Sequence, residues 1–308
     1  MTNADFEKIV ETSDEWIVTR TGIKERRIAN GMASSDMAVE AAKKALEMAG
    51  CANDEIGIII VGTVTPDYRL PSTACIVQEK MGLPNAVALD VTAACTGFIT
   101  GMSLAAPLVE NGQYHRALVI GVEKLSAFTD YTDRNTCVLF GDAAGAAVLA
   151  PDSNGSGLIS TYLRSDGSYR KLLWAEVGGT VEPYSPDFAY DGRDKIYMNG
   201  ADVFKVAVKE MCNAALKVIE NAGLQPSDVS LIVPHQANIR IIEAIAKRLK
   251  LGMDRVFVNI EKYGNTSAAS IPLALDEANR AGKIKPGDYV LTVAFGGGLI
   301  WGANLLRW

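Results

Sequence analysis

Three side chains in this sequence are of types that can together transfer an acyl group. Cys95 offers a thiol, His235 is one of only two histidines, and Asn265 carries a side-chain amide. A thiolate attacks a carbonyl carbon and then holds the acyl group as a thioester. An imidazole and an amide can donate hydrogen bonds to the oxygen that becomes negatively charged. Each residue also has a structural interpretation, as a buried small side chain, a core histidine or a turn residue.

Cys95 lies where a strand pattern changes to a helix pattern. The apolar residues 87–89 precede it, and apolar side chains at helical spacing follow it as far as the stop signal Asn111-Gly112. At such a turn, free backbone N–H groups and the positive end of the helix dipole favour the thiolate over the thiol. The position therefore favours a nucleophile, with a buried structural cysteine as the alternative.

The other two candidates also follow strand patterns. His235 comes soon after the apolar residues 231–233, and Asn265 lies beyond residues 256–259 in a run of small side chains. Glycines 296–298 separate two further apolar segments, which indicates either a tight hairpin or a backbone N–H that reaches a developing oxyanion. In open α/β sheets, ligands bind at the carboxyl ends of strands, where these residues are expected.

The chain contains two similar halves. Residues 49–60 align without a gap with residues 222–233, and each segment is typical of a helix end, a Gly stop, a polar turn and a buried strand. We interpret this as a duplicated α/β unit, with one half at residues 1–155 and the other at 156–308. Equivalent strand ends would then converge, which brings the cysteine near the histidine and the asparagine. Chance similarity of two common helix–turn–strand units is the alternative.

Composition narrows the function classes. The 308 residues are 48% hydrophobic and 21% charged, which predicts a globular protein with a sizeable core. The net charge of −6 without a Lys/Arg block argues against a nucleic-acid partner. The apolar runs are too short for a membrane span, and acidic residues interrupt the start of the chain, so no signal peptide is expected. Five widely spaced cysteines without a C-x-x-C pair predict no disulfide framework, no metal site and a cytoplasmic location.

Three motifs surround the candidate residues: TAACTGF at residues 92–98, PHQAN at 234–238 and GNTSAAS at 264–270. They resemble the motifs of β-ketoacyl-acyl-carrier-protein synthase III, the initiating condensing enzyme of type II fatty-acid synthesis in the thiolase superfamily. The Cys–His–Asn set separates this family from the elongating synthases, which use Cys–His–His. The implied fold is α/β and thiolase-like, with two similar halves in a layered α-β-α-β-α arrangement. Further matching stretches, at residues 12–23, 133–134, 295–298 and 301–302, extend the resemblance over nearly the whole chain.

The resemblance implies an acyltransferase that condenses a primer acyl-CoA with malonyl-acyl-carrier protein and releases CO2. Cys95 would carry the primer acyl group, and His235 and Asn265 would hold the malonyl thioester carbonyl and stabilise the enolate. The backbone N–H groups of Cys95 and Gly297 would form the oxyanion hole. No cofactor is implied beyond the coenzyme A thioester that serves as substrate.

The resemblance also implies where coenzyme A binds. Trp16 and Arg134 match positions that flank the CoA adenine, and an indole face and a guanidinium suit a flat base and phosphates. Arg20 and Asn238 match further CoA-binding positions at the mouth of the tunnel. For Trp16, a partly buried surface aromatic is the alternative interpretation.

Two protein partners follow from the resemblance. In a homodimer, the residue matching Leu70 closes the acyl pocket of the other subunit, and a Leu in place of an aromatic there favours longer or branched primers. An acidic acyl carrier protein would dock on a basic helix face after His235, where an ordinary solvated face is the alternative. The basic residues are Arg240, Lys247, Arg248 and Lys250.

The sequence departs from the family pattern in three places. The family begins with a short strand and a Gly-containing loop ahead of the segment at residues 2–5, and that strand is not in this sequence, although the second half has its counterpart at residues 158–163. Ala143 stands where the family commonly has Gly. Residues 177–195 form a longer segment than expected, either a flap over the tunnel or an ordinary surface loop.

Two other functions are consistent with the same residues. A ketosynthase or acyltransferase of secondary metabolism would use the same acyl-Cys95 with a different acceptor. A non-catalytic carrier-binding scaffold would keep the fold without using the thiol. The complete set of Cys95, His235 and Asn265 argues against the scaffold, whereas the sequence leaves primary or secondary metabolism and the length of the primer open.

Overall fold

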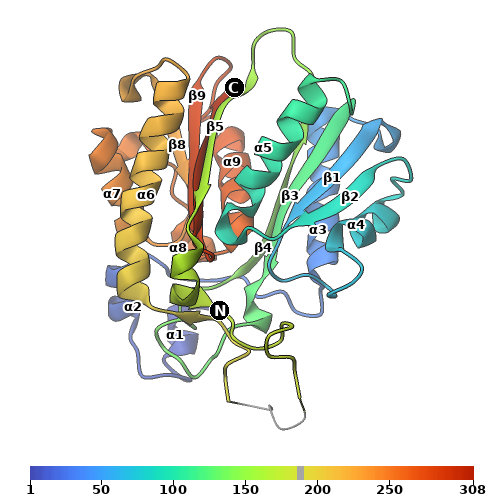
Figure 1. Ribbon diagram of the computed structural model, residues 1–308. Helices are drawn as coiled ribbons and strands as arrows, with labels where there is room; N and C mark the ends of the chain where they lie inside the picture. Colours follow the sequence, from blue (N-terminus) through green and yellow to red (C-terminus); the bar gives the residue numbers. More distant parts are fainter. Residues whose placement is uncertain (186–190) are drawn as a thin grey trace.

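The chain forms two α/β halves that lie side by side, as the computed structural model in Figure 1 shows for residues 1–185 and 191–308. Each half contributes one four-stranded sheet. The first sheet has the order β2 (Val87–Val91), β1 (Ile56–Gly62), β3 (Arg116–Lys124) and β4 (Asp142–Leu149). The second has the order β5 (Gly157–Ser165), β10 (Ile300–Arg307), β9 (Tyr289–Gly296) and β8 (Leu231–Pro234).

The two sheets repeat one pairing pattern. β1 runs parallel to β3, which pairs antiparallel with β4, and β8 runs parallel to β9, which pairs antiparallel with β10. The sheets differ at their outer edges, because β10 also pairs with β5, whereas β4 has no second strand partner among the described residues. They also differ at residues 256–259, where the expected strand is reduced to a single bridge between Ile232 and Val256.

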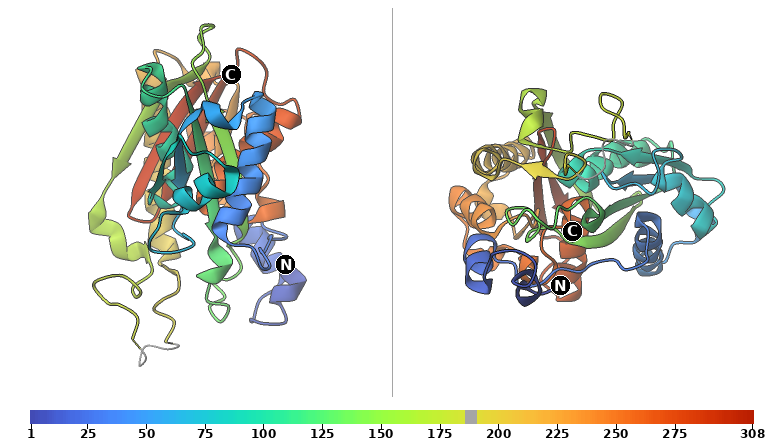
Figure 2. Two further views of the ribbon diagram at one scale, coloured as in Figure 1. Left: turned by 90° about the vertical axis from the view of Figure 1, so that its right-hand side faces the viewer. Right: turned by 90° about the horizontal axis from the view of Figure 1, so that it is seen from below.

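Helices complete a five-layer α-β-α-β-α arrangement, which confirms the fold that the resemblance implied. Two helices pack between the sheets, α5 (Gly97–Glu110) and α9 (Ser270–Arg280). On the outside, α3 (Ser34–Ala49) and α4 (Thr73–Met81) cover the first sheet, and α6 (Gly200–Asn221) and α7 (Ile239–Leu249) cover the second. Figure 2 shows these outer helices on opposite sides of the molecule. The short helices are α1 (Asn3–Phe6), α2 (Asp14–Thr21) and α8 (Ile260–Tyr263).

The burial pattern explains why α5 occupies the central layer. Its residues Phe98, Ile99 and Met102 are almost completely buried, and so are β1 residues such as Ile58 and Ile60, which pack against it. A helix that is apolar over most of its surface is stable only between two apolar layers. The start of α5, immediately after Cys95, is therefore held rigidly between the two sheets.

One close backbone contact fixes the start of α5 against the first sheet. A Cβ atom added at Gly62, at the end of β1, would lie 2.5 Å from the carbonyl carbon of Gly97. We expect Gly62→Ala to lower the free energy of unfolding by about 1–3 kcal/mol, because the overpacked backbones must separate. Urea unfolding measures this difference. Gly167→Ala is the matched control, since its Cβ would meet open space and the change should stay within about 0.5 kcal/mol.

The remaining departures from the family pattern have simple structural outcomes. Ala143 lies within β4 in extended backbone, where its methyl group is tolerated. Of the 177–195 segment, residues 186–190 lie outside the described residues, and the proposal of a flap falls partly on them. None of the described helices combines the length and the apolar character needed to cross a membrane.

Candidate active site

Cys95, His235 and Asn265 lie around one cavity of about 110 Å³. Cys95 lies in the single turn η2 (Ala94–Thr96), between β2 and α5, and His235 follows directly after β8. Asn265 was expected beyond a strand, but it follows the short helix α8. The two halves of the chain thus contribute the thiol from one side, and the imidazole and amide from the other.

The turn that carries Cys95 is held in an uncommon conformation. Ala94 has φ +45°, a left-handed backbone that residues other than glycine rarely adopt. The end of β9 presses against this turn, since a Cβ at Gly296 would lie 2.6 Å from the Cys95 nitrogen. Gly297 is the next residue, and it lines a second cavity that Cys95 also lines. The end of β9 and the turn of Cys95 are therefore in close backbone contact beside the cavity.

Burial dominates the protonation state of Cys95. Surrounding protein raises the pKa of its thiol to about 12, and interactions with the Ser267 side chain and with the Cys95 backbone lower it only in part. Desolvation of the charged form thus acts against the preference for the thiolate that is expected at the start of a helix.

His235 is positioned as a neutral hydrogen-bond donor. It is buried, and burial lowers its pKa to about 3. Its Nδ1 lies 2.6 Å from the Ser270 hydroxyl, whose oxygen also accepts from the Gln236 backbone at 3.5 Å. The Ser270 hydroxyl is thus free to donate its own proton to Nδ1, which leaves the hydrogen of the ring on Nε2. A neutral imidazole with N–H at Nε2 can donate into the cavity.

Asn265 is also oriented so that its side chain can donate a hydrogen bond into the cavity. Its Oδ1 accepts from the Ser267 backbone at 2.9 Å, which assigns the amide orientation. Its own backbone bridges Leu139 and Gly141 with hydrogen bonds of 2.8 and 3.0 Å. Because Oδ1 is engaged, Nδ2 is the group left to donate into the cavity. The cavity therefore combines a thiol with two neutral donors.

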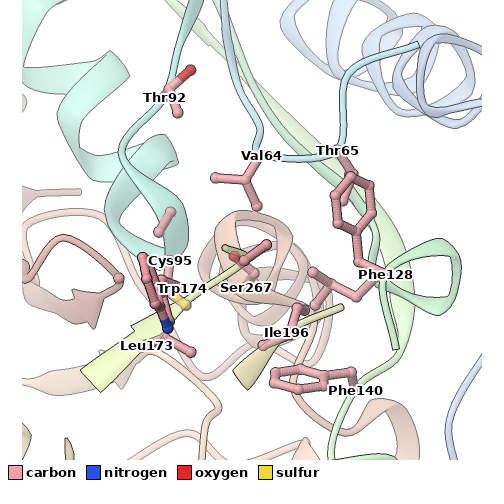
Figure 3. Close-up of a pocket in the computed structure, with 14 residues that line it drawn as sticks. Val64, Thr65, Thr92, Cys95, Phe128, Phe140, Leu173, Trp174, Ile196 and Ser267 are labelled. Carbon is pink, nitrogen blue, oxygen red and sulfur yellow. The ribbon is translucent and has the colours of Figure 1, made fainter. Parts of the chain in front are cut away.

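Cys95 lies between this central cavity and a second one, named the deeper cavity because it lies on the side of Cys95 away from His235 and Asn265. The deeper cavity, of about 240 Å³, has a mostly apolar wall that includes Phe128, Phe140 and Trp174 (Figure 3). Leu173 and Trp174 form β6 (Leu173–Trp174), which pairs with β7 (Tyr197–Met198). Ile196, just before β7, completes this wall. An apolar chamber next to a nucleophile suits an acyl chain attached to it.

An outer cavity of about 430 Å³ opens on the other side of the central one. The outer and central cavities share five lining residues, so together they form one path from the surface to Cys95. The shared residues are Leu139, Met198, Gly200, Phe204 and Asn238. Trp16 and Arg20 line the outer cavity because α2 packs against α7. Three cavities in series, with the thiol between the inner two, form a tunnel with a reactive centre.

The sequence-predicted CoA-binding residues gather at the mouth of this tunnel. The guanidinium carbons of Arg20 and Arg134 lie 4.5 and 4.9 Å from the centre of the Trp16 ring. Asn238 donates from Nδ2 to the Arg20 carbonyl at 2.9 Å. At 4.9 Å, Arg134 already occupies the space over Trp16, so a base that stacks between the two side chains must displace it.

The remaining predicted residues lie on the surface. Leu70 is 87% exposed and lines neither cavity next to Cys95 in the single chain. The four basic residues are exposed on α7 and at its end, and among the described residues none of them forms an ion pair. Arg240 alone reaches the outer cavity, with its guanidinium 5.5 Å from the Phe204 ring. The other three are Lys247, Arg248 and Lys250.

Sequence reasoning did not identify three polar residues next to the site. Ser267 and Ser270 lie inside the GNTSAAS motif, but their hydrogen bonds to Asn265 and His235 depend on the folded geometry. Glu123, at the end of the apolar strand β3, is completely buried beside Ser267. Its only signal in the sequence is a lone carboxylate within a strand of buried apolar residues.

Comparison with known proteins identifies relatives of this chain over its whole length. A family model described as 3-Oxoacyl-[acyl-carrier-protein (ACP)] synthase III matches residues 89–167, and its C-terminal counterpart matches residues 219–308. Beta-ketoacyl-[acyl-carrier-protein] synthase III of Caldanaerobacter subterraneus is 53% identical, with 100% of this chain and 93% of the relative covered.

Solved structures share the whole fold. The crystal structure of 3-oxoacyl-[acyl-carrier-protein] synthase III from Aquifex aeolicus superimposes with a TM-score of 0.94 at 49% identity, covering 100% of this chain and 95% of that one. The priming beta-ketosynthase from the R1128 polyketide biosynthetic pathway superimposes with a TM-score of 0.92 at 36% identity, covering 99% and 91%.

Proposed function

Because this chain belongs to the 3-oxoacyl-[acyl-carrier-protein] synthase III family, we propose that it condenses a primer acyl-CoA with malonyl-acyl-carrier protein. The product is 3-ketoacyl-carrier protein, formed with loss of CO2 in the initiating step of fatty-acid synthesis. One observation supports this most strongly: the Cys95 thiol and the donors His235 and Asn265 line one cavity. The secondary-metabolism alternative has less support, because the polyketide ketosynthase is the more distant relative in sequence.

The first half-reaction is acylation of Cys95. The sulfur attacks the thioester carbonyl of acyl-CoA, and the carbonyl oxygen becomes an oxyanion. The backbone N–H groups of Cys95 and Gly297 stabilise this oxyanion, since two neutral donors in a water-poor site act strongly on a developing charge. Coenzyme A then leaves as a thiolate, and the acyl chain extends into the deeper apolar cavity.

The second half-reaction is decarboxylation followed by carbon–carbon bond formation. The Nε2–H of His235 and the Nδ2 of Asn265 donate to the malonyl thioester carbonyl, whose oxygen takes up the charge when CO2 is lost. A neutral imidazole is required, because a cation would also hold the carboxylate in place. The enolate then attacks the acyl carbonyl on Cys95 and releases the cysteine thiolate, and one proton taken up from water in each cycle restores the thiol.

Substrate recognition follows from the tunnel mouth. Trp16, Arg20, Arg134 and Asn238 hold the nucleotide end of coenzyme A, and no cofactor is needed beyond this substrate. The acidic carrier protein binds at the exposed basic side chains of α7 and its end. Their positive charge mainly raises the rate of association and sets the orientation of the carrier protein. These side chains are Arg240, Lys247, Arg248 and Lys250. The functional unit is a homodimer. Its proposed location is the cytoplasm, where the five free cysteines would stay reduced.

Leu70 sets the primer preference if the partner subunit delivers it to the deeper cavity. We expect the protein to use isobutyryl- and octanoyl-CoA as well as acetyl-CoA. Leu70→Phe should lower the rates with the two longer primers, relative to the rate with acetyl-CoA, by about 10-fold. Initial rates with the three primers measure this ratio. Leu70→Met, which conserves volume, is the control that should keep the ratio. A strict acetyl preference of the unsubstituted protein contradicts this role.

A product assay tests the proposed function itself. Purified protein supplied with acyl-CoA and malonyl-carrier protein should release coenzyme A, CO2 and 3-ketoacyl-carrier protein in equal amounts. An acyl-enzyme that passes its acyl group only to another acceptor would support the secondary-metabolism alternative instead. A protein that binds the carrier without ever forming an acyl-enzyme would be the scaffold.

A further inference from the structure

Arg26 is the largest of the described side chains that the fold buries completely, and the proposed mechanism does not use it. Its Nε donates to the Val138 carbonyl at 2.8 Å, and its Nη2 donates to the same oxygen. Its Nη1 donates to the Asn3 side chain at 2.5 Å. The guanidinium also lies 4.6 Å from the centre of the Phe6 ring. A buried guanidinium is costly unless its donors are bonded, and here all three nitrogens have an acceptor.

The Val138 carbonyl belongs to a short segment, residues 138–141, that lies just before β4 and outside the strands. Val138 is completely buried, and within the described part of the chain Arg26 is the sole donor to its carbonyl. Buried backbone outside a sheet lacks the hydrogen bonds of a ladder and needs partners from side chains. Arg26 therefore fixes the start of this segment.

The stem of Arg26 packs between this segment and the turn before Asn265. A Cβ atom added at Gly141 would lie 3.3 Å from the Cβ of Arg26, and one added at Gly264 would lie 3.0 Å from its Cγ. Gly264 ends α8 in a left-handed conformation at φ +65°, which favours glycine. Arg26 thus contacts both backbone segments that meet at Asn265.

The segment 138–141 holds the main chain of Asn265 directly. The Asn265 N–H donates to the Leu139 carbonyl at 2.8 Å, and the Gly141 N–H donates to the Asn265 carbonyl at 3.0 Å. The two backbones pair here as a parallel bridge. Val138, which Arg26 binds, is the residue next to Leu139. A shift of the segment would therefore move Asn265, and its Nδ2 with it.

We propose that Arg26 is a positioning residue that holds the Asn265 amide where it donates to the malonyl thioester carbonyl. It acts through the segment 138–141, because Arg26 itself lines none of the three tunnel cavities. His235 is oriented by Ser270 and does not depend on this segment. Arg26 therefore serves decarboxylation and leaves acylation of Cys95 unaffected. The step that Asn265 assists rests on the proposed function.

Arg26→Lys keeps the positive charge but cannot place three nitrogens at these acceptors. We expect it to lower kcat for decarboxylation of a malonyl thioester about 10-fold, with KM nearly unchanged, because a displaced donor of about 1 Å costs up to about 100-fold. Acylation of Cys95 by acyl-CoA should proceed at the normal rate. CO2 release and acyl-enzyme formation measure the two steps.

A double-mutant cycle separates positioning from a general loss of structure. Added to Asn265→Ala, Arg26→Lys should lower decarboxylation no further, because the amide that Arg26 positions is gone. Added to His235→Ala, it should still lower decarboxylation about 10-fold. A folded Arg26→Lys protein with unchanged decarboxylation overturns the proposal. So does a full 10-fold loss in the Asn265→Ala background.

Two further variants keep the test decisive if Arg26→Lys does not fold. Phe6→Leu removes the ring beside the guanidinium but leaves its hydrogen bonds in place. It should lower decarboxylation about 3-fold, again without effect in the Asn265→Ala background. Val218→Ala, in the core between α6 and the second sheet, is the control for lost stability alone. It should keep the ratio of decarboxylation to acylation, and the same ratio in Phe6→Leu overturns the proposal.

Amide hydrogen exchange tests the positioning without any substrate. In Arg26→Lys, or in Phe6→Leu, exchange of the Asn265 amide should be about 10-fold faster, whereas exchange in α6 should not change. If this local change appears but the unsubstituted protein never decarboxylates a malonyl thioester, the positioning of Asn265 stands and the proposed function fails. If that protein decarboxylates and the variants match it in rate and exchange, the function stands and this inference fails.

Discussion

Replacing Cys95 by Ala is expected to abolish condensation, with kcat/KM for product formation lowered by at least about 1,000-fold. The acyl group would have no sulfur to which it could be transferred, and no other described thiol lines the central cavity. Decarboxylation of the malonyl thioester should persist, because its two donors remain. Release of CO2 and formation of 3-ketoacyl product, measured on one sample, separate the two activities.

Cys75→Ala is the matched control for this prediction. Cys75 is a free, exposed cysteine at the start of α4 that lines none of the three tunnel cavities. It should retain full condensation activity. A Cys95→Ala protein that still forms 3-ketoacyl product at a rate near that of the unsubstituted protein would remove the covalent acyl-enzyme from the account.

Replacing His235 or Asn265 by Ala is expected to lower decarboxylation by about 100- to 1,000-fold, because each change removes one donor to the developing enolate oxygen. Acylation of Cys95 should fall much less, since its oxyanion depends on backbone N–H groups. The pKa of His235, lowered to about 3, keeps the imidazole neutral, so decarboxylation should be constant between pH 5.5 and 8. Rates of CO2 release and of acyl-enzyme formation measure the two steps.

His115→Ala is the control for the histidine change. His115 is exposed, with 67% of its side chain accessible, and its nearest carboxylate is Glu55 at 4.0 Å. Both steps should proceed normally in this variant. Equal loss of acylation and decarboxylation in His235→Ala would contradict the separate roles given to the two halves of the site.

The convergence of the three site residues was predictable from the sequence because the duplication relates distant strand ends. His235 follows its strand as expected. Asn265 reached the same cavity by a different local path, through α8 instead of a regular strand. The segment at residues 256–259, with three apolar residues followed by Asn259, pairs through a single bridge because neighbouring contacts already hold it in place. The positions of side chains were therefore more predictable than the elements that carry them.

Electrostatics could not be predicted from the sequence. The favourable turn at Cys95 is visible in the motif, but the degree of burial that raises its pKa is a property of the folded halves together. The same holds for Glu123, whose donors come from residues 63–65 and from Ser267, far apart in the chain. The stacking of Arg134 on Trp16 likewise depends on contacts between distant segments.

Peptide mapping by mass spectrometry after incubation with acyl-CoA tests the central claim most directly. The account predicts an acyl adduct on the peptide that contains Cys95, formed in proportion to coenzyme A released. Addition of malonyl-carrier protein should remove this adduct and transfer the acyl group to the product. An absent adduct, an adduct on another residue, or an adduct that malonyl-carrier protein does not discharge would contradict the claim.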